Sequence, residues 1–274
     1  MDLNTIAGYR HARTRDDLAL APGERIVAGG TWFFSEPQVD ATRVVDITEM
    51  GWPDVEELPD GGLRIAATCP IATLAALPAH PGRHALPLFF QCATALLASF
   101  KIWNVATVGG NICRSFAAGS MVSLAVALDG DALVWRPDGT DRRLPVAELV
   151  TGNGTNTLEP GEVLRAVDIP AHALRAHTAY RKIALAELGR SGAVVTGRRD
   201  DDGATVFGIT AATGWPTVLR YPAVPEADRL HSDVTSAAGY YTDPMGSADW
   251  RRGVSAVLAE EIRGELIDHA RSGR

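Results

Sequence analysis

The chain has 274 residues, of which 46% are hydrophobic and 22% are charged, a composition typical of globular proteins that bury a core. Its formal net charge of −7 argues against a nucleic-acid partner and against binding to an anionic membrane. The sequence contains no apolar run long enough for a membrane span and no signal-peptide pattern at its start. We therefore expect a cytoplasmic protein.

Metal-binding patterns are absent from the sequence. The three cysteines, Cys69, Cys92 and Cys113, are far apart, form no C-x-x-C pair and are too few for a typical iron–sulfur cluster. The seven histidines form no HExxH or similar zinc pattern. The sequence thus predicts buried, reduced thiols and no metal site on this chain.

Asp-Gly pairs divide several short β-branched runs. They occur at residues 60–61, 138–139 and 202–203. An Asp-Gly pair between such runs is typical of a tight β-hairpin turn, because both residues tolerate positive φ. Each pair therefore predicts a hairpin.

Apolar residues at helical spacing predict a helix over residues 93–103 and a short buried helix over residues 121–128. The same spacing recurs in the C-terminal segment, where these residues share one face: Trp250, Val254, Val257, Leu258, Ile262 and Leu266. Ser247 is expected to be the N-cap of this long terminal helix. Together with the hairpins, these helices predict an α+β protein.

Two apolar runs each end in a Gly-Gly pair, in Ile26–Trp32 (IVAGGTW) and Ala106–Cys113 (ATVGGNIC). Glycine admits positive φ, and successive backbone N–H groups in such a turn form a concave site for an anion. Neither a Rossmann fingerprint nor a P-loop is present to bind a phosphate in another way. Plain tight turns explain both pairs equally well, so the residues alone leave the two interpretations open.

A family resemblance favours the anion site. IVAGGTWFF resembles the first flavin loop, AGGT, of the FAD-binding medium subunits of molybdenum hydroxylases of the xanthine dehydrogenase and carbon monoxide dehydrogenase type. ATVGGNIC resembles their second loop, TxGGN. Further segments resemble the family in the same order: VVDIT, IAATCPIATL, SLAVALDG, GEVLRAVDIP, AYRKIAL and TDPMGSADWRRGVSAVL. The resemblance extends over nearly the whole chain.

The resemblance implies a two-part α+β flavoprotein. Residues 1–170 would form a vanillyl-alcohol-oxidase-like (PCMH-type) FAD-binding domain, divided into two subdomains near residues 52–60. Residues 171–274 would form a smaller α+β domain of the carbon monoxide dehydrogenase flavoprotein type, with an antiparallel sheet and the long terminal helix.

FAD is the cofactor that the resemblance implies, with its pyrophosphate between the two Gly-Gly segments, Leu164 near the flavin and Lys182 beside the isoalloxazine. The expected cofactor-binding residues are Ala28, Gly29, Gly30, Thr31, Trp32, Thr107, Val108, Gly109, Gly110, Asn111, Ser120, Leu164 and Lys182. No catalytic residue is expected. Ser120 stands where the family usually has an acidic residue, and Trp32 where a small polar or acidic residue is common.

The implied function is electron transfer inside a larger enzyme. In this family a molybdopterin-binding large subunit hydroxylates the substrate, and electrons pass through the [2Fe–2S] clusters of a small subunit to FAD and on to NAD, a quinone or oxygen. The same partners are expected here. Two alternatives stay open: a stand-alone FAD-dependent oxidoreductase, and an assembly module that has lost FAD, which the serine at position 120 would favour.

Overall fold

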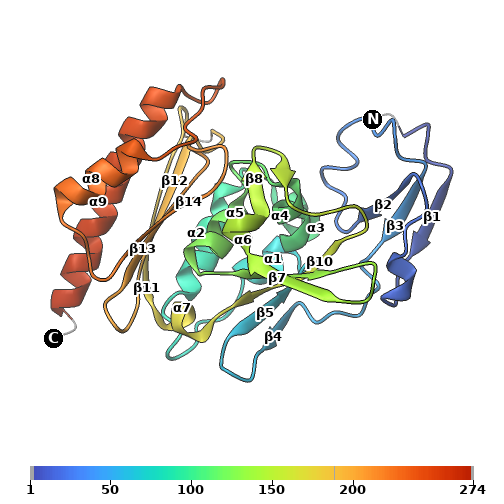
Figure 1. The fold of residues 1–274 in the computed structure, drawn as a ribbon, viewed down its shortest axis with the longest axis horizontal. Helices are drawn as coiled ribbons and strands as arrows, with labels where there is room; N and C mark the ends of the chain where they lie inside the picture. Colours follow the sequence, from blue (N-terminus) through green and yellow to red (C-terminus); the bar gives the residue numbers. More distant parts are fainter. Residues whose placement is uncertain (1–2, 188, 273–274) are drawn as a thin grey trace.

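The computed structural model describes residues 3–187 and 189–272, and three main sheets organise them (Figure 1). The first sheet is parallel, in the order β1-β3-β2, and lies at the N-terminal end of the molecule. Its strands are β1 (Gly8–His11), β2 (Glu24–Val27) and β3 (Arg43–Asp46), with the 3₁₀ helix η1 (Asp16–Leu18) between β1 and β2.

The second sheet is antiparallel, in the order β4-β5-β10-β6-β7. Its strands are β4 (Val55–Glu57), β5 (Leu63–Ala66), β6 (Asp131–Trp135), β7 (Asp141–Pro145) and β10 (Val163–Ile169). A small hairpin pairs β8 (Val150–Gly152) with β9 (Thr155–Asn156).

Helices pack against this second sheet to form the largest core of the molecule. They are α1 (Ile71–Ala75), α2 (Leu86–Ala95), α3 (Phe100–Val105), α4 (Val108–Arg114), α5 (Ser120–Ala127), α6 (Val146–Leu149) and α7 (Ala171–Arg175). The expected buried helix over residues 121–128 is confirmed as α5, whose side chains are all buried.

The third sheet is antiparallel, in the order β11-β12-β13-β14. Its elements are β11 (His177–Ile183), β12 (Ala193–Arg199), β13 (Thr205–Thr210), β14 (Thr217–Tyr221), α8 (Ala227–Ser236) and α9 (Ala248–Ser272). Helix α9 covers one face, with α8 packed beside it, while α2 and α5 contact the other face (Figure 1). With both faces covered, the central strands β12 and β13 are almost wholly buried.

All three Asp-Gly hairpins are confirmed: they join β4 to β5, β6 to β7 and β12 to β13. The long terminal helix is confirmed as α9, and the Ser247 Oγ accepts a hydrogen bond from the Trp250 N–H at 3.2 Å, as expected of an N-cap. Val257 was expected on the buried face and is not there, since its side chain is 60% exposed. Among the described residues, no helix is both long and apolar enough to cross a membrane.

The expected single helix over residues 93–103 is wrong, because the chain forms α2 and α3 with an extended break at Leu96. Two side chains from β11 and from the connection after it explain why α2 ends there. Lys182 Nζ donates to the carbonyl of Thr94 at 3.4 Å, and Ser191 Oγ donates to that of Ala95 at 3.5 Å. These side chains partner carbonyls that end a helix without intrahelical bonds, so tertiary contacts determine where α2 ends.

Candidate cofactor-binding site

The structure places the first Gly-Gly segment against the end of α3, directly before the second segment. The first, residues 28–32, follows β2, and the second, residues 107–111, begins at the end of α3. A Cβ atom on Gly29 would lie 1.8 Å from the carbonyl oxygen of Val105, just before the second segment. Because no side chain fits at that distance, glycine is required at position 29 for the first segment to lie against the end of α3.

The first segment keeps the geometry of an anion-binding turn. Gly30 has a φ of +67°, which glycine adopts without strain. Among the described residues, none accepts a hydrogen bond from the backbone N–H groups of residues 29–32. Consecutive free N–H groups around a left-handed residue form a concave surface suited to a phosphate.

The second segment differs from the expected turn, because Gly109 and Gly110 lie in the first turn of α4 and neither has a positive φ. The backbone N–H groups of this segment also donate hydrogen bonds to acceptors inside the protein. Gly110 donates to the Thr107 N-cap hydroxyl at 3.1 Å, and Asn111 donates to the Thr107 carbonyl at 3.0 Å. Val108 and Gly109 donate to carbonyls in the connection between β5 and α1, both at 2.9 Å.

Packing explains the glycine at position 109. A Cβ there would meet the Cβ of Ala67 at 2.4 Å and its Cα at 2.7 Å. The second Gly-Gly pair therefore lets α4 start directly against the β5–α1 connection, and it does not present a row of free donors.

The start of α5 involves both Ser120, its first residue, and Asn111, whose side chain reaches it from α4. The Asn111 side-chain oxygen accepts a hydrogen bond from the Met121 N–H at 2.9 Å and so caps this helix. Ser120 is fully buried, and its hydroxyl has no hydrogen-bond partner among the described residues. Neither side chain has the charge that an acidic residue would bring to this position.

Sequence reasoning missed Arg114, the last residue of α4. Its guanidinium carbon lies 3.4 Å from the ring centre of Trp32 and 4.7 Å from that of Phe116. Burial lowers the pKa of Arg114, opposed by the charge of Glu36, and its Nε is buried without a hydrogen-bond partner among the described residues. The sequence feature that pointed to this residue was Trp32, a large aromatic side chain two residues after a Gly-Gly pair.

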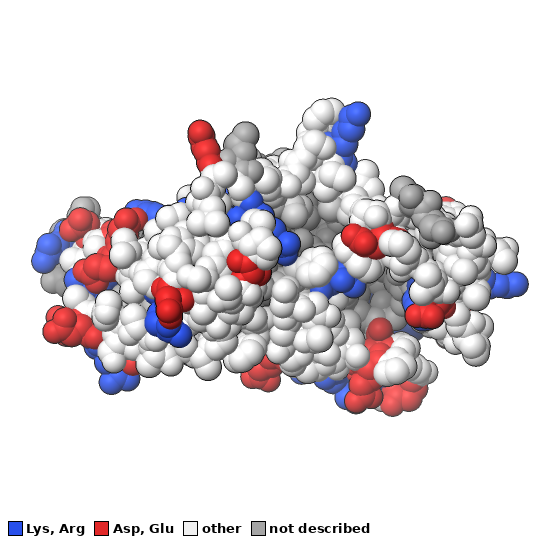
Figure 2. Space-filling view, turned by 90° about the horizontal axis from the view of Figure 1, so that it is seen from above, with Lys and Arg blue, Asp and Glu red and all other residues white. Residues whose placement is uncertain are grey.

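Lys182 and Leu164 lie in the two larger sheets. Lys182 is on β11, with its ammonium group at the end of α2. Leu164 is on β10, a strand that contacts α4, and its side chain is buried in the central core. Figure 2 shows the molecule hollowed near its middle, with Lys and Arg side chains bordering the hollow.

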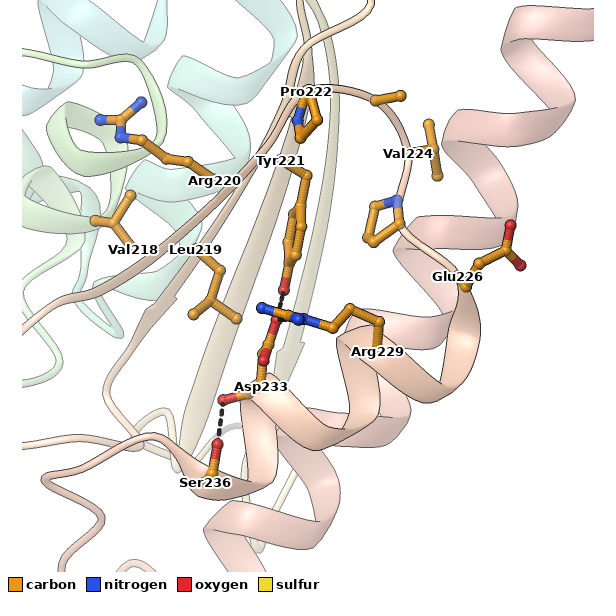
Figure 3. Close-up of a pocket in the computed structure, with 12 residues that line it drawn as sticks. Val218, Leu219, Arg220, Tyr221, Pro222, Val224, Glu226, Arg229, Asp233 and Ser236 are labelled. Atoms are coloured by element: carbon orange, nitrogen blue, oxygen red, sulfur yellow. Dashed lines mark hydrogen bonds and ion pairs between the residues drawn. The ribbon is translucent and has the colours of Figure 1, made fainter.

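The cavity in Figure 3 lies elsewhere, between β14 and α8, and has a volume of about 770 Å³. None of the expected site residues lines it. Three of its polar side chains already pair with one another: the Tyr221 hydroxyl donates to Asp233 at 2.8 Å, and Arg229 donates to the same carboxylate at 2.6 Å. We therefore place the candidate site at the Gly-Gly segments.

Fold and site together define a mixed helix-and-sheet protein with free N–H donors and an unpaired guanidinium beside a glycine turn, a combination suited to an anionic ligand. The sequence model described as "FAD binding domain in molybdopterin dehydrogenase" matches residues 11–172, more than half of the chain. The chain belongs to this family, and its cofactor is FAD.

Named relatives agree with the family. An FAD-binding subunit assigned to xanthine dehydrogenase in Escherichia coli (strain K12) is 29% identical over 226 residues, which cover 78% of this chain and 76% of that protein. The alpha subunit of the 6-hydroxypseudooxynicotine dehydrogenase complex of Paenarthrobacter nicotinovorans is 25% identical, over 68% of this chain and 67% of that protein. This chain is thus an FAD-binding subunit of the molybdenum hydroxylase family.

A solved structure shows the same fold. A chain of the reconstituted CO dehydrogenase from Oligotropha carboxidovorans aligns with a TM-score of 0.80 and 19% identity, covering 94% of this chain and 98% of that one. The donors around residues 29–32 fit the diphosphate of FAD, because that group is anionic and needs N–H partners.

Proposed function

We propose that this protein is the electron-transfer subunit of a multi-subunit molybdenum hydroxylase, located in the cytoplasm. One observation carries the proposal: the family match over residues 11–172 coincides with relatives that are named as subunits of dehydrogenases. The proposed fold type is the vanillyl-alcohol-oxidase-like (PCMH-type) domain over residues 1–170, divided near residues 52–60 and followed by the C-terminal domain over residues 171–274.

In this proposal residues 28–32 and 107–111 hold FAD, with Ser120 and Leu164 close to it. The first segment contributes free N–H groups, and the end of α3, directly before the second segment, lies against the first at Gly29. Lys182 contributes a positive charge near the isoalloxazine. FAD, when bound, supplies the redox chemistry, and the protein supplies binding, orientation and electrostatics.

The proposed partners are a molybdopterin-binding large subunit and a small subunit with [2Fe–2S] clusters, and the external acceptor is NAD, a quinone or oxygen. The state of this chain's cysteines supports such a division. Burial raises the pKa of both Cys69 and Cys113 to about 12, so both thiols stay protonated at neutral pH. A protonated thiol is a poor metal ligand.

Reconstitution of the full chain with FAD, followed by co-expression with candidate large and small chains, tests the proposal. We expect flavin absorbance in the isolated subunit, and co-purification of molybdenum and iron with the assembled complex. A flavin in the isolated chain that a small substrate reduces without any partner would instead support a stand-alone oxidoreductase. No flavin absorbance after reconstitution would support an assembly module that has lost its cofactor.

A further inference from the structure

We propose that Arg114 is the principal anion-binding side chain of this site, and that its guanidinium, held over the Trp32 ring, binds the diphosphate of a dinucleotide beside the free N–H groups of residues 29–32. The inference rests on the proposed function, in which FAD lies between the Gly-Gly segments. It identifies a residue whose role neither the glycine pattern nor the family match specifies.

The need for such a side chain follows from the hydrogen bonds of the second segment. The N–H groups of residues 108–111 all donate to acceptors inside the protein. Only the first segment keeps free backbone donors, and these are uncharged. A diphosphate is negatively charged, and neutral N–H donors stabilise that charge only in part. A hydrogen bond from a nearby cation would be stronger than one from a neutral donor.

Arg114 has the charge and lacks a partner. The two fully buried arginines show the contrast: Arg198 pairs with Asp129, and Arg251 pairs with Asp243. For Arg114, the structure shows ring contacts and no ion pair or hydrogen bond of its guanidinium to any described residue. A partly buried cation without a partner is costly unless a ligand neutralises it.

The local backbone holds Arg114 in place. Ser115, the residue after it, has a left-handed φ of 52°. Asn156 donates to the Cys113 carbonyl at 2.8 Å and to the Ser115 hydroxyl at 3.0 Å, which fixes this helix end. The Trp32 ring then supports the guanidinium from the first segment. A side chain positioned in this way loses little freedom when it binds an anion.

A second cation lies nearby. The guanidinium carbon of Arg190, in the connection between β11 and β12, is 5.8 Å from the centre of the Phe116 ring, the ring that Arg114 also contacts. Glu36 is the acidic group that acts on Arg114, and it forms no ion pair with it among the described residues. The positive charge of Arg114 is therefore available to a ligand.

We compare the affinities of the full-length apoprotein for FAD, ADP and riboflavin. FAD and ADP contain a diphosphate and riboflavin does not, so the comparison distinguishes a contact with the diphosphate from a contact with the flavin ring. Arg114→Gln is expected to weaken FAD and ADP binding by the same factor, about 10- to 100-fold, and to leave riboflavin binding unchanged. Arg114→Lys keeps the charge but lacks the planar guanidinium, so it should recover part of the loss. Arg229→Gln, the same charge change on the exposed helix α8, is the matched control and should bind like the wild type.

Arginine-specific modification with phenylglyoxal, read by mass spectrometry, provides a second measurement on the unmutated chain. We expect FAD and ADP to protect Arg114 and not Arg229, and riboflavin to protect neither. If the wild type binds FAD and Arg114→Gln binds it equally well, the inference fails while the proposed function stands. If the wild type binds no FAD, the proposed function itself fails. Loss of riboflavin binding in Arg114→Gln would also overturn the inference, because it would place Arg114 at the flavin ring.

Discussion

The backbone of Gly29 lies directly against Val105, where a Cβ would meet the Val105 carbonyl oxygen at 1.8 Å. This contact joins the N-terminal parallel sheet, through the turn after β2, to the helices of the central core. It places the free N–H groups of residues 29–32 next to the start of α4. The site therefore depends on a single close backbone approach between segments far apart in the chain.

Gly29→Ala is expected to lower the free energy of unfolding by about 1–3 kcal/mol, as overpacking does, and to weaken FAD retention because the turn must move. Urea unfolding and equilibrium dialysis with FAD measure the two effects. Gly253→Ala is the matched control: it lies in α9, where a Cβ would have no atom within 4 Å, and it should be neutral or stabilise by up to about 1 kcal/mol. Wild-type stability in Gly29→Ala would show that the two segments do not meet in solution.

Hairpins and the terminal helix follow from local sequence. An Asp-Gly pair determines its turn from two adjacent residues, and Ser247 caps α9 through a bond within one helical turn. The end of α2 was not predictable in this way, because the residues that partner its last carbonyls lie far along the chain: Lys182 is on β11, and Ser191 is in the connection between β11 and β12. Only the folded chain brings them to Thr94 and Ala95.

The sequence predicted which segments form the candidate site, but not which of their N–H groups are free to bind a ligand. The paired glycines predicted two segments acting together, and the structure places the first, at Gly29, against the residues directly before the second. A sequence does not reveal which N–H groups are already bonded, so the two segments looked equivalent although only the first keeps free donors. Arg114 escaped notice because its main partner, Trp32, lies in a distant part of the chain.

Asn111→Ala is expected to destabilise the protein by about 1 kcal/mol, the usual cost of losing a helix cap, because the Asn111 side chain accepts the Met121 N–H at the start of α5. Asn111→Asp keeps an acceptor and adds a negative charge favoured at a helix start, so it should retain near wild-type stability. Thermal unfolding of both variants measures the difference. Equal melting temperatures for Asn111→Ala and the wild type would rule out the capping role.

Arg198 connects the third sheet to the central core. Its side chain is almost wholly buried, and it donates to the Ala127 carbonyl at 3.0 Å and to the Asp129 carboxylate at 2.5 Å. Arg198→Met removes the buried partner of that carboxylate, which keeps its hydrogen bond from Arg220 at 2.7 Å, so we expect a loss of about 1.5–3 kcal/mol in urea unfolding. Arg229→Met removes an exposed ion pair on α8 and should change stability by less than about 1 kcal/mol. A similar effect of both substitutions would contradict the connecting role.

Asp129 should make the stability of the protein depend on pH in acid. Burial raises its pKa, but hydrogen bonds from Arg220 and Arg198 outweigh burial and hold the pKa at about 2. An unfolded aspartate titrates near 3.9, so the folded state gains stability that is complete above about pH 4 and disappears as the pH falls toward 2.

Urea unfolding of the wild type and of Asp129→Asn at pH 5, 4, 3 and 2 isolates this contribution. Asparagine tolerates the left-handed φ of 50° at this position,, so the variant removes the charge without straining the turn. The wild type is expected to lose roughly 2 kcal/mol more than the variant between pH 5 and pH 2. Other carboxylates, such as Glu24 with its pKa of about 2, affect both proteins equally and cancel in the difference. Parallel pH profiles would mean that the Asp129 carboxylate is not held by Arg198 and Arg220 in solution.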